Sequence, residues 1–165
     1  MDTLQISECE LRMSASKSNW CHAASAVCPV PALEAFRFLG DGLQLGRWGL
    51  GSFQTLEVAP GLFSGTSLFD GSRSLIRLVS DPDRLQVDYH VGSDPETLKA
   101  RIIARVVALN EEGGQPSCIV SLIAWRSATM DDRRWERLMA CHDAEVHLIC
   151  ALLEQPIRHP KDSAS

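Results

Sequence analysis

Apolar and polar residues alternate along six consecutive segments in the middle of the chain. These segments are short and rich in β-branched residues, and turn residues such as Pro60-Gly61 and Asp70-Gly71 separate them. This pattern is typical of antiparallel strands joined by tight turns. The sequence therefore predicts a meander of six strands, at residues 52–58, 62–69, 73–79, 84–91, 98–109 and 117–127.

The hydrophobic period changes from residue 130 onward. Residues 130–154 contain no Gly or Pro, and Asp131 and Asp132 stand at the start, where a helix dipole favours negative charge. An apolar stripe follows with helical spacing, through Trp135, Leu138, Met139, His142, Val146, Ile149, Cys150 and Leu153. The pattern predicts one helix about 37 Å long, enough to cross a whole sheet.

Shorter elements are expected before the meander. Residues 20–28 favour a strand, which Pro29 ends, and residues 31–39 favour a helix that begins at Pro31. Residues 41–46 favour one further short helical turn. We expect residues 1–18 to be a loosely ordered leader, residues 19–155 to form a single domain, and residues 156–165 to be a flexible tail.

This order of elements predicts an α+β fold in which a curved antiparallel sheet of about seven strands wraps around the long C-terminal helix. One predicted strand turns small residues toward that helix. Its inner face carries Ala100, Ile102, Ala104, Val106 and Ala108, against Lys99, Arg101, Ile103 and Arg105 outside. Small inward residues leave space, so we expect a mostly apolar cavity that binds a ligand.

Residues 26–39, with the sequence AVCPVPALEAFRFL, are followed by Asp41 and Trp48. This stretch resembles the opening of the SRPBCC superfamily, which includes START-like and polyketide cyclase/dehydrase-like proteins. Members commonly read Val-x-Ala-Pro-x-x-x-Val-Phe-x-x-Leu-x-Asp and then Trp. The strand at residues 88–91 and the helix end at residues 152–154 fit the same template, so the resemblance covers residues 20–155. Gly40 and Gly42 depart from it and are expected to loosen the segment after the first helix.

The resemblance implies the helix-grip fold, with two short helices after the first strand and a cavity for a hydrophobic ligand. It places Trp48 near the cavity entrance, where the ring would gate the cavity or stack on a ligand; a ring wedged between helix and sheet is the alternative. The resemblance does not specify a reaction, because proteins with one fold carry many functions.

His142 is the candidate catalytic residue, because it lies on the apolar stripe of the long helix, beside Trp135, Leu138 and Val146. A histidine there would orient a polar group of the ligand or act as acid or base; otherwise it bonds a strand carbonyl or water at the rim. Glu145, Asp143 and His147 are interpreted as a solvated helix edge. Too few ligands converge for a metal site, and no motif indicates a cofactor.

Tyr89 faces inward with its apolar neighbours, as a polar anchor in the cavity or a plain core residue, whereas Asp88 and His90 face outward. The last strand has two possible phases. In one, Cys118, Val120, Leu122 and Ala124 face inward and Arg126 lies near the cavity mouth, where it could hold a ligand carboxylate. In the other, Trp125 lines the cavity.

The composition argues against two classes of protein, those that bind nucleic acid and those that span a membrane. The 165 residues carry a net charge of −5, which argues against nucleic-acid binding, and no apolar run is long enough to span a membrane. The six cysteines show no C-x-x-C spacing and are expected to be free thiols packed as small hydrophobes, in keeping with a cytoplasmic protein.

We therefore expect a protein that binds a small lipid-, aromatic- or polyketide-like ligand. The alternatives are a cyclase or dehydratase that uses His142, and a protein-interaction module. The sequence does not indicate an oligomeric state.

Overall fold

A computed structural model describes residues 20–109 and 114–155 of the chain. The predicted leader and tail lie outside these residues. The strands and helices, in chain order, are β1 (Cys21–Cys28), α2 (Ala32–Leu39), α3 (Gly42–Trp48), β2 (Phe53–Ala59), β3 (Leu62–Thr66), β4 (Arg73–Asp81), β5 (Gln86–Gly92), β6 (Lys99–Leu109), β7 (Ser117–Trp125) and α4 (Asp132–Glu154).

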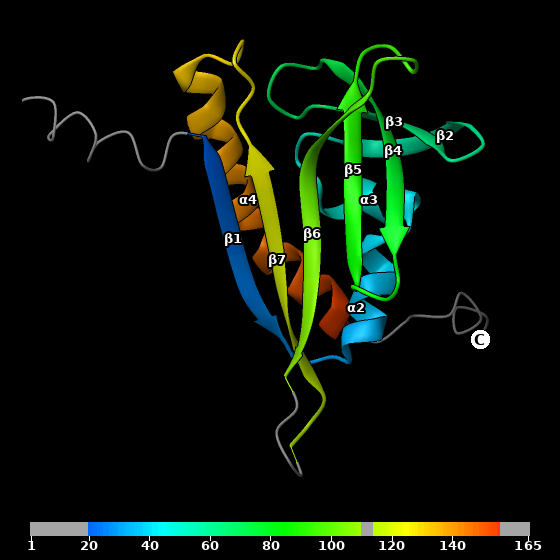
Figure 1. The fold of residues 1–165 in the computed structure, drawn as a ribbon, viewed down its shortest axis with the longest axis vertical. Coiled ribbons are helices and arrows are strands. Elements are labelled where there is room, and N and C mark those ends of the chain that lie inside the picture. The colour runs from blue at the N-terminus through cyan, green and yellow to red at the C-terminus, as the bar shows by residue number, and fades with distance from the viewer. Residues whose placement is uncertain (1–19, 110–113, 156–165) are drawn as a thin grey trace, which may run out of the picture.

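The strands form one antiparallel sheet in the order β1-β7-β6-β5-β4-β3-β2. The six consecutive strands from β2 to β7 are the predicted meander, and β1 returns to pair with β7. The sheet curves around α4, which runs along β1 and β7, while α2 and α3 cover the rest of the inner face (Figure 1). The predicted α+β helix-grip architecture is confirmed.

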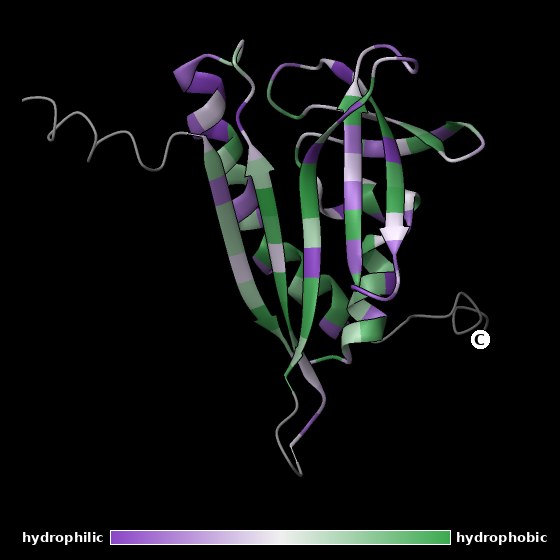
Figure 2. Cartoon of the chain, in the orientation of Figure 1, coloured by the Kyte–Doolittle hydropathy of each residue, from purple (hydrophilic) through white to green (hydrophobic). Residues whose placement is uncertain are grey.

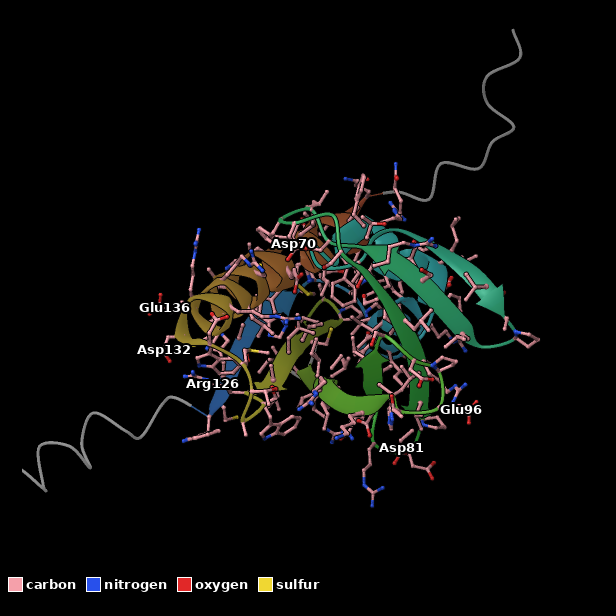
Figure 3. All side chains as sticks on the ribbon, turned by 90° about the horizontal axis from the view of Figure 1, so that it is seen from above. Asp70, Asp81, Glu96, Arg126, Asp132 and Glu136 are labelled. Carbon is pink, nitrogen blue, oxygen red and sulfur yellow. A yellow bond between two sulfur atoms is a disulfide. The ribbon has the colours of Figure 1, made fainter. Side chains whose placement is uncertain are left out.

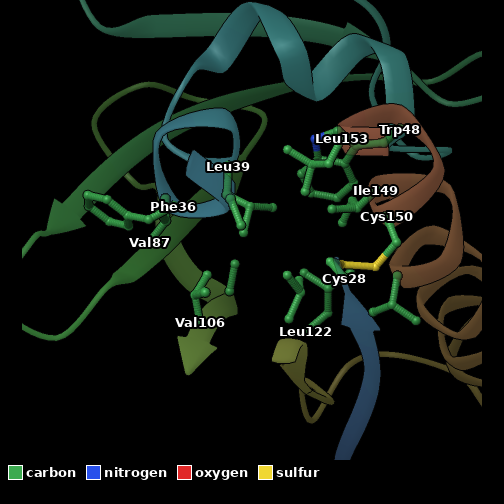
Figure 4. Close-up of a cluster of buried hydrophobic side chains, with 14 of the residues drawn as sticks. Cys28, Phe36, Leu39, Trp48, Val87, Val106, Leu122, Ile149, Cys150 and Leu153 are labelled. Carbon is green, nitrogen blue, oxygen red and sulfur yellow. A yellow bond between two sulfur atoms is a disulfide. The ribbon is translucent and has the colours of Figure 1, made fainter. Parts of the chain in front are cut away.

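Helix α4 begins as the sequence predicts, with an acidic residue at its N-terminus. The Asp131 carboxylate accepts a hydrogen bond of 2.7 Å from the backbone N–H of Arg134 and so caps the helix. The first turns of α4 are hydrophilic (Figure 2), and its buried residues lie mainly in the second half. Those residues meet α2 and the ends of β1 and β7 in the apolar core drawn in Figure 4.

Helix α3 packs closely on the sheet. A Cβ atom added at Gly42 would lie 2.4 Å from the Phe63 ring, and one at Gly46 would lie 2.6 Å from the backbone nitrogen of Thr55. The expectation that Gly42 loosens this segment is therefore wrong, because glycine there permits contact between helix and sheet. The predicted turn extends into a seven-residue helix that ends at Trp48.

The structure decides the open question of the β7 phase. Cys118, Val120, Leu122 and Ala124 are fully buried and face inward. On β6, Ala104 and Val106 face inward as predicted, whereas Ala100 and Ala108 are exposed. A register shift between β5 and β6 lets Tyr89 pair with Ile102 and His90 with Ala100, and this bulge interrupts the alternation at Ala100.

The expectation of free cysteines is wrong for two of the six. Cys28 at the end of β1 and Cys150 on α4 form a disulfide, with Cα atoms 5.0 Å apart (Figure 4). The two residues are 122 positions apart, and only the packing of α4 on β1 brings them together. Disulfides are more typical of oxidising compartments, so the cysteines no longer support a cytoplasmic location.

No helix within the described ranges is long and apolar enough to cross a membrane.

Candidate functional site

A cavity of about 210 Å³ lies between α4, α3 and the inner face of β4, β5 and β6. Its walls are mostly apolar. Figure 3 looks down on this end of the molecule, where Asp70 lies at the rim beside α4. The residues that line it include Trp48, Ser74, Tyr89, Ile102, His142 and Glu145.

The size of the cavity limits what it can hold. An apolar cavity of about 150 Å³ accommodates benzene, and sites for drug-sized molecules occupy about 300–1,000 Å³. A volume of about 210 Å³ therefore fits a compound with one ring, or two small ones. A long acyl chain or a multi-ring polyketide would need the walls to move.

Helix α4 supplies one wall through a single stripe of its surface. Counted from the first of them, the lining residues of α4 recur after three, four, seven, eight and eleven positions, so they lie on one face of the helix. The stripe begins with the exposed Arg134 and the half-buried Arg137 and ends with the buried His142 and Glu145. Leu138 and Cys141 lie between them.

Trp48 and Tyr89 form the aromatic part of the cavity wall. Both are buried, and their rings meet edge to face with centroids 6.0 Å apart. The Tyr89 hydroxyl donates a hydrogen bond of 2.7 Å to the carbonyl oxygen of Leu39, and burial raises the pKa of Tyr89 far above its usual value. The hydroxyl proton of Tyr89 is therefore already used in a hydrogen bond within the protein.

His142 and Glu145 are neighbouring polar groups in this wall. Their side chains are 3% and 6% exposed, and His142 Nε2 lies 3.8 Å from Glu145 Oε2. The other carboxyl oxygen of Glu145 accepts a hydrogen bond of 2.8 Å from the backbone N–H of Leu50. Within the described residues, His142 Nδ1 has no hydrogen-bond partner.

Burial favours the neutral form of both groups. Desolvation lowers the pKa of His142 to about 4, assisted by the nearby His22, while Asp143 opposes the shift. Desolvation also raises the pKa of Glu145 to about 7, although the Leu50 N–H lowers it somewhat. The His142–Glu145 contact is therefore not an ion pair at neutral pH. Glu145, rather than His142, changes its charge near pH 7.

Replacing Glu145 with Gln is expected to change how stability depends on pH. The Glu145 pKa is about 7 in the folded protein and ordinarily 4.5, so the folded state binds more protons between these values. Protonated Glu145 therefore stabilises the folded state at low pH. As pH rises from about 4.5 to 7, this contribution to the free energy of unfolding, about 3 kcal/mol, is lost. Glu145→Gln removes this loss and should gain stability relative to wild type from pH 5 to pH 8.

Urea denaturation of both proteins at the two pH values measures that difference. His142, whose lowered pKa gives the opposite slope between about 4 and 6.5, is present in both proteins and cancels. An unchanged difference between pH 5 and pH 8 would contradict the assigned burial of a titrating Glu145.

The mouth of the cavity is closed on one side by contacts between α4 and the β3–β4 turn. The Arg137 guanidinium lies 4.9 Å from the centre of the Phe69 ring and 3.4 Å from an Asp70 carboxylate oxygen. Hydrogen bonds from the Ser72 side chain and backbone are the main cause of a strongly lowered Asp70 pKa. Phe69 lies in this turn and not in the strand predicted for residues 62–69, because β3 ends at Thr66.

The sequence matches no known family model, and no curated protein is similar to it in sequence. Solved structures are similar in fold. A START superfamily protein from Mycobacterium smegmatis superposes with a TM-score of 0.61 at 9% identity, covering 82% of this chain and 98% of that protein. The Zhui aromatase/cyclase from a Streptomyces species gives a TM-score of 0.56 at 16% identity, over 84% and 95%. The chain has the START-like helix-grip fold.

An uncharacterised protein from Bacillus thuringiensis shares this fold, with a TM-score of 0.60 at 12% identity, covering 82% of this chain and 99% of that one. Identities this low establish the fold alone. Function depends on the residues that line the cavity and not on the fold.

The structure brings together about half of the residues that the sequence suggested for a helix-grip cavity. Five of them line it: Trp48, Tyr89, Ile102, Leu138 and His142. Three others are buried in the packed interior and do not line it: Ala104, Trp135 and Val146. Ala104 is 1% exposed and is not among the lining residues, so the cavity does not extend to it as expected.

The remaining two predicted residues lie outside the cavity. Trp125 is 40% exposed, because the β7 phase turns it outward. Arg126 comes directly after β7, in line with the residues of that strand that face inward. Its guanidinium nevertheless donates hydrogen bonds to the Met130 carbonyl and the Asp132 carboxylate at the start of α4 (Figure 3). It therefore ties β7 to the first turn of α4 and does not reach the lining of the cavity.

Glu145 is the main residue that sequence reasoning misplaced. The sequence predicts a solvated helix edge at this position, whereas Glu145 is 5% exposed. The signal was its position three residues after His142 on the same helix face. Asp143 does face outward, as predicted, and its carboxylate lies 3.0 Å from His22 Nε2 on β1. No group of three potential metal ligands occurs in the part of the chain that is described.

Proposed function

We propose that this protein binds a small, largely apolar ring compound in the cavity between α4 and the sheet. The observation that carries the proposal is an apolar cavity of about 210 Å³ in an otherwise packed helix-grip core. Apolar contacts would hold the body of the ligand at Trp48, Ile102 and Leu138, and the polar groups near His142 would orient it. Open volume argues against the third alternative, a module whose sheet recruits a protein partner.

A thermal-shift screen tests this proposal with one-ring and two-ring compounds beside long-chain fatty acids. A ligand at 100 times its Kd stabilises the folded state by about 2.7 kcal/mol. For a chain of this size, that raises Tm by roughly 5–10 °C. We expect the shifts to come from the ring compounds and not from the fatty acids. No shift from any ring compound at its solubility limit would contradict the proposal.

A second candidate function is acid–base catalysis of the cyclase or dehydratase kind. The observation that favours it is a buried carboxyl group with a pKa of about 7 in the cavity wall, next to a neutral histidine. Such a carboxyl group can accept and return a proton near neutral pH. Chemical turnover of a bound ketone, detected by mass spectrometry of the small molecules, would favour catalysis over binding alone.

A further inference from the structure

One oxygen of the buried Glu145 carboxyl group has no hydrogen-bond donor in the described part of the chain. Oε1 accepts the Leu50 N–H, but the nearest ring nitrogen to Oε2 is His142 Nε2, at 3.8 Å. That distance is too long for a hydrogen bond. The Glu145 side chain as a whole is only 6% exposed, and polar groups in such surroundings normally find a hydrogen-bond partner. Glu145 lines the cavity, so a bound molecule can supply that partner.

Two donors near Glu145 are already engaged, whereas the Trp48 Nε1–H, which also lines the cavity, has no partner within the described residues. The Tyr89 hydroxyl donates to Leu39, and the Leu50 N–H already bonds Oε1. Leu50 is itself held in place, because its carbonyl oxygen accepts a hydrogen bond of 3.0 Å from the Leu68 N–H. The carboxyl group is therefore fixed by the α3–β2 connection and the β3–β4 turn, and it cannot move toward another donor without breaking these contacts.

We propose that the ligand of this cavity carries a neutral hydroxyl or ring N–H group that donates a hydrogen bond to Glu145 Oε2. This inference rests on the proposed function, since it requires that the cavity bind a ligand. It narrows the ligand to small ring compounds of the phenol type, with the polar end at Glu145 and the ring against Trp48 and Ile102.

The charges around the cavity favour a neutral donor over an ionic one. An anionic group at this depth would meet the Glu145 carboxyl group itself. A cation would pass Arg134 and Arg137 at the outer end of the α4 stripe, where Asp70 offsets only one positive charge. A hydroxyl group satisfies Oε2 without bringing a second charge into the apolar cavity, which would cost desolvation energy.

Phenol and toluene provide a matched test, because they differ by one hydroxyl in place of a methyl group. Toluene is the more apolar, so hydrophobic transfer alone predicts tighter binding of toluene. At pH 8, above the Glu145 pKa of about 7, most Glu145 carboxyl groups are ionised, and a hydrogen bond to a charged acceptor reverses this order. We expect calorimetric titration at pH 8 to show phenol binding about tenfold tighter than toluene, and tighter than benzylamine or benzoate.

Two variants on α4 separate the role of Glu145 from a general change of charge. Glu145→Gln should lower the phenol-to-toluene affinity ratio at least fivefold while toluene still binds. Glu136→Gln removes the same charge from an exposed position and should keep the wild-type ratio. If Glu145→Gln does not fold, the order of the four probes on wild-type protein still decides the question.

The outcomes are distinguishable. Toluene binding as tightly as phenol, tightest binding of benzylamine or benzoate, or a ratio unchanged by Glu145→Gln would overturn the inference and leave the proposed function intact. Failure of all four probes to bind would overturn both.

Discussion

Reduction of the Cys28–Cys150 disulfide is expected to lower the free energy of unfolding by about 4–5 kcal/mol. The bond closes a loop of about 122 residues, and a cross-link of that span removes much of the conformational entropy of the unfolded chain. It also fastens α4 to β1, and these two elements form one side of the cavity-bearing core.

Urea denaturation with and without a reducing agent measures this effect without changing any side chain. The double variant Cys28→Ala/Cys150→Ala should show a loss at least as large, because both positions are also buried. Cys21→Ala is the matched control, since Cys21 is a free and exposed cysteine on β1. Equal unfolding midpoints for the oxidised and reduced wild-type protein would contradict the prediction.

Filling the cavity from β4 is expected to abolish ligand binding. Ser74 faces inward on β4 and lines the cavity. An indole ring is somewhat larger than benzene, for which about 150 Å³ is enough, so Ser74→Trp should occupy most of the 210 Å³. We expect the affinity for phenol to fall at least a hundredfold, with a change in unfolding free energy of about 1 kcal/mol or less.

Two further tryptophan substitutions make this result specific. Val79→Trp places the same ring on the exposed face of β4 and should leave binding unchanged. Ala104→Trp should destabilise the protein by about 3 kcal/mol or more, because Ala104 is buried and does not line the cavity. If Ser74→Trp still binds phenol with wild-type affinity, the ligand does not occupy this cavity.

The order of strands and helices could be predicted from the sequence because it depends on local patterns. Two-residue alternation between turn dipeptides identified the meander, and an unbroken 3.6-residue pattern identified α4. Alternation also predicted that Tyr89 faces inward, as the structure shows. Each strand, turn or helix signal lies within about 25 neighbouring residues.

The site depends on contacts between segments that are distant in sequence, and these were harder to predict. The burial of Glu145 requires Leu50, which lies 95 positions away, to supply its N–H group. The pairing of Cys28 with Cys150 requires α4 to lie along β1. Periodicity also left the phase of β7 open, since both faces of that strand are apolar, and only its register with β6 and β1 turns Trp125 outward.

The tryptophan indole signals in an NMR titration with phenol test the central claim most directly. The chain has four tryptophans, at positions 20, 48, 125 and 135, and of these only Trp48 lines the cavity. If the cavity binds a one-ring compound, the Trp48 Nε1–H signal will shift with saturation, while those of Trp20 and Trp125 stay in place. No saturable shift of the Trp48 signal, or shifts confined to the exposed tryptophans, would contradict ligand binding between α4 and the sheet.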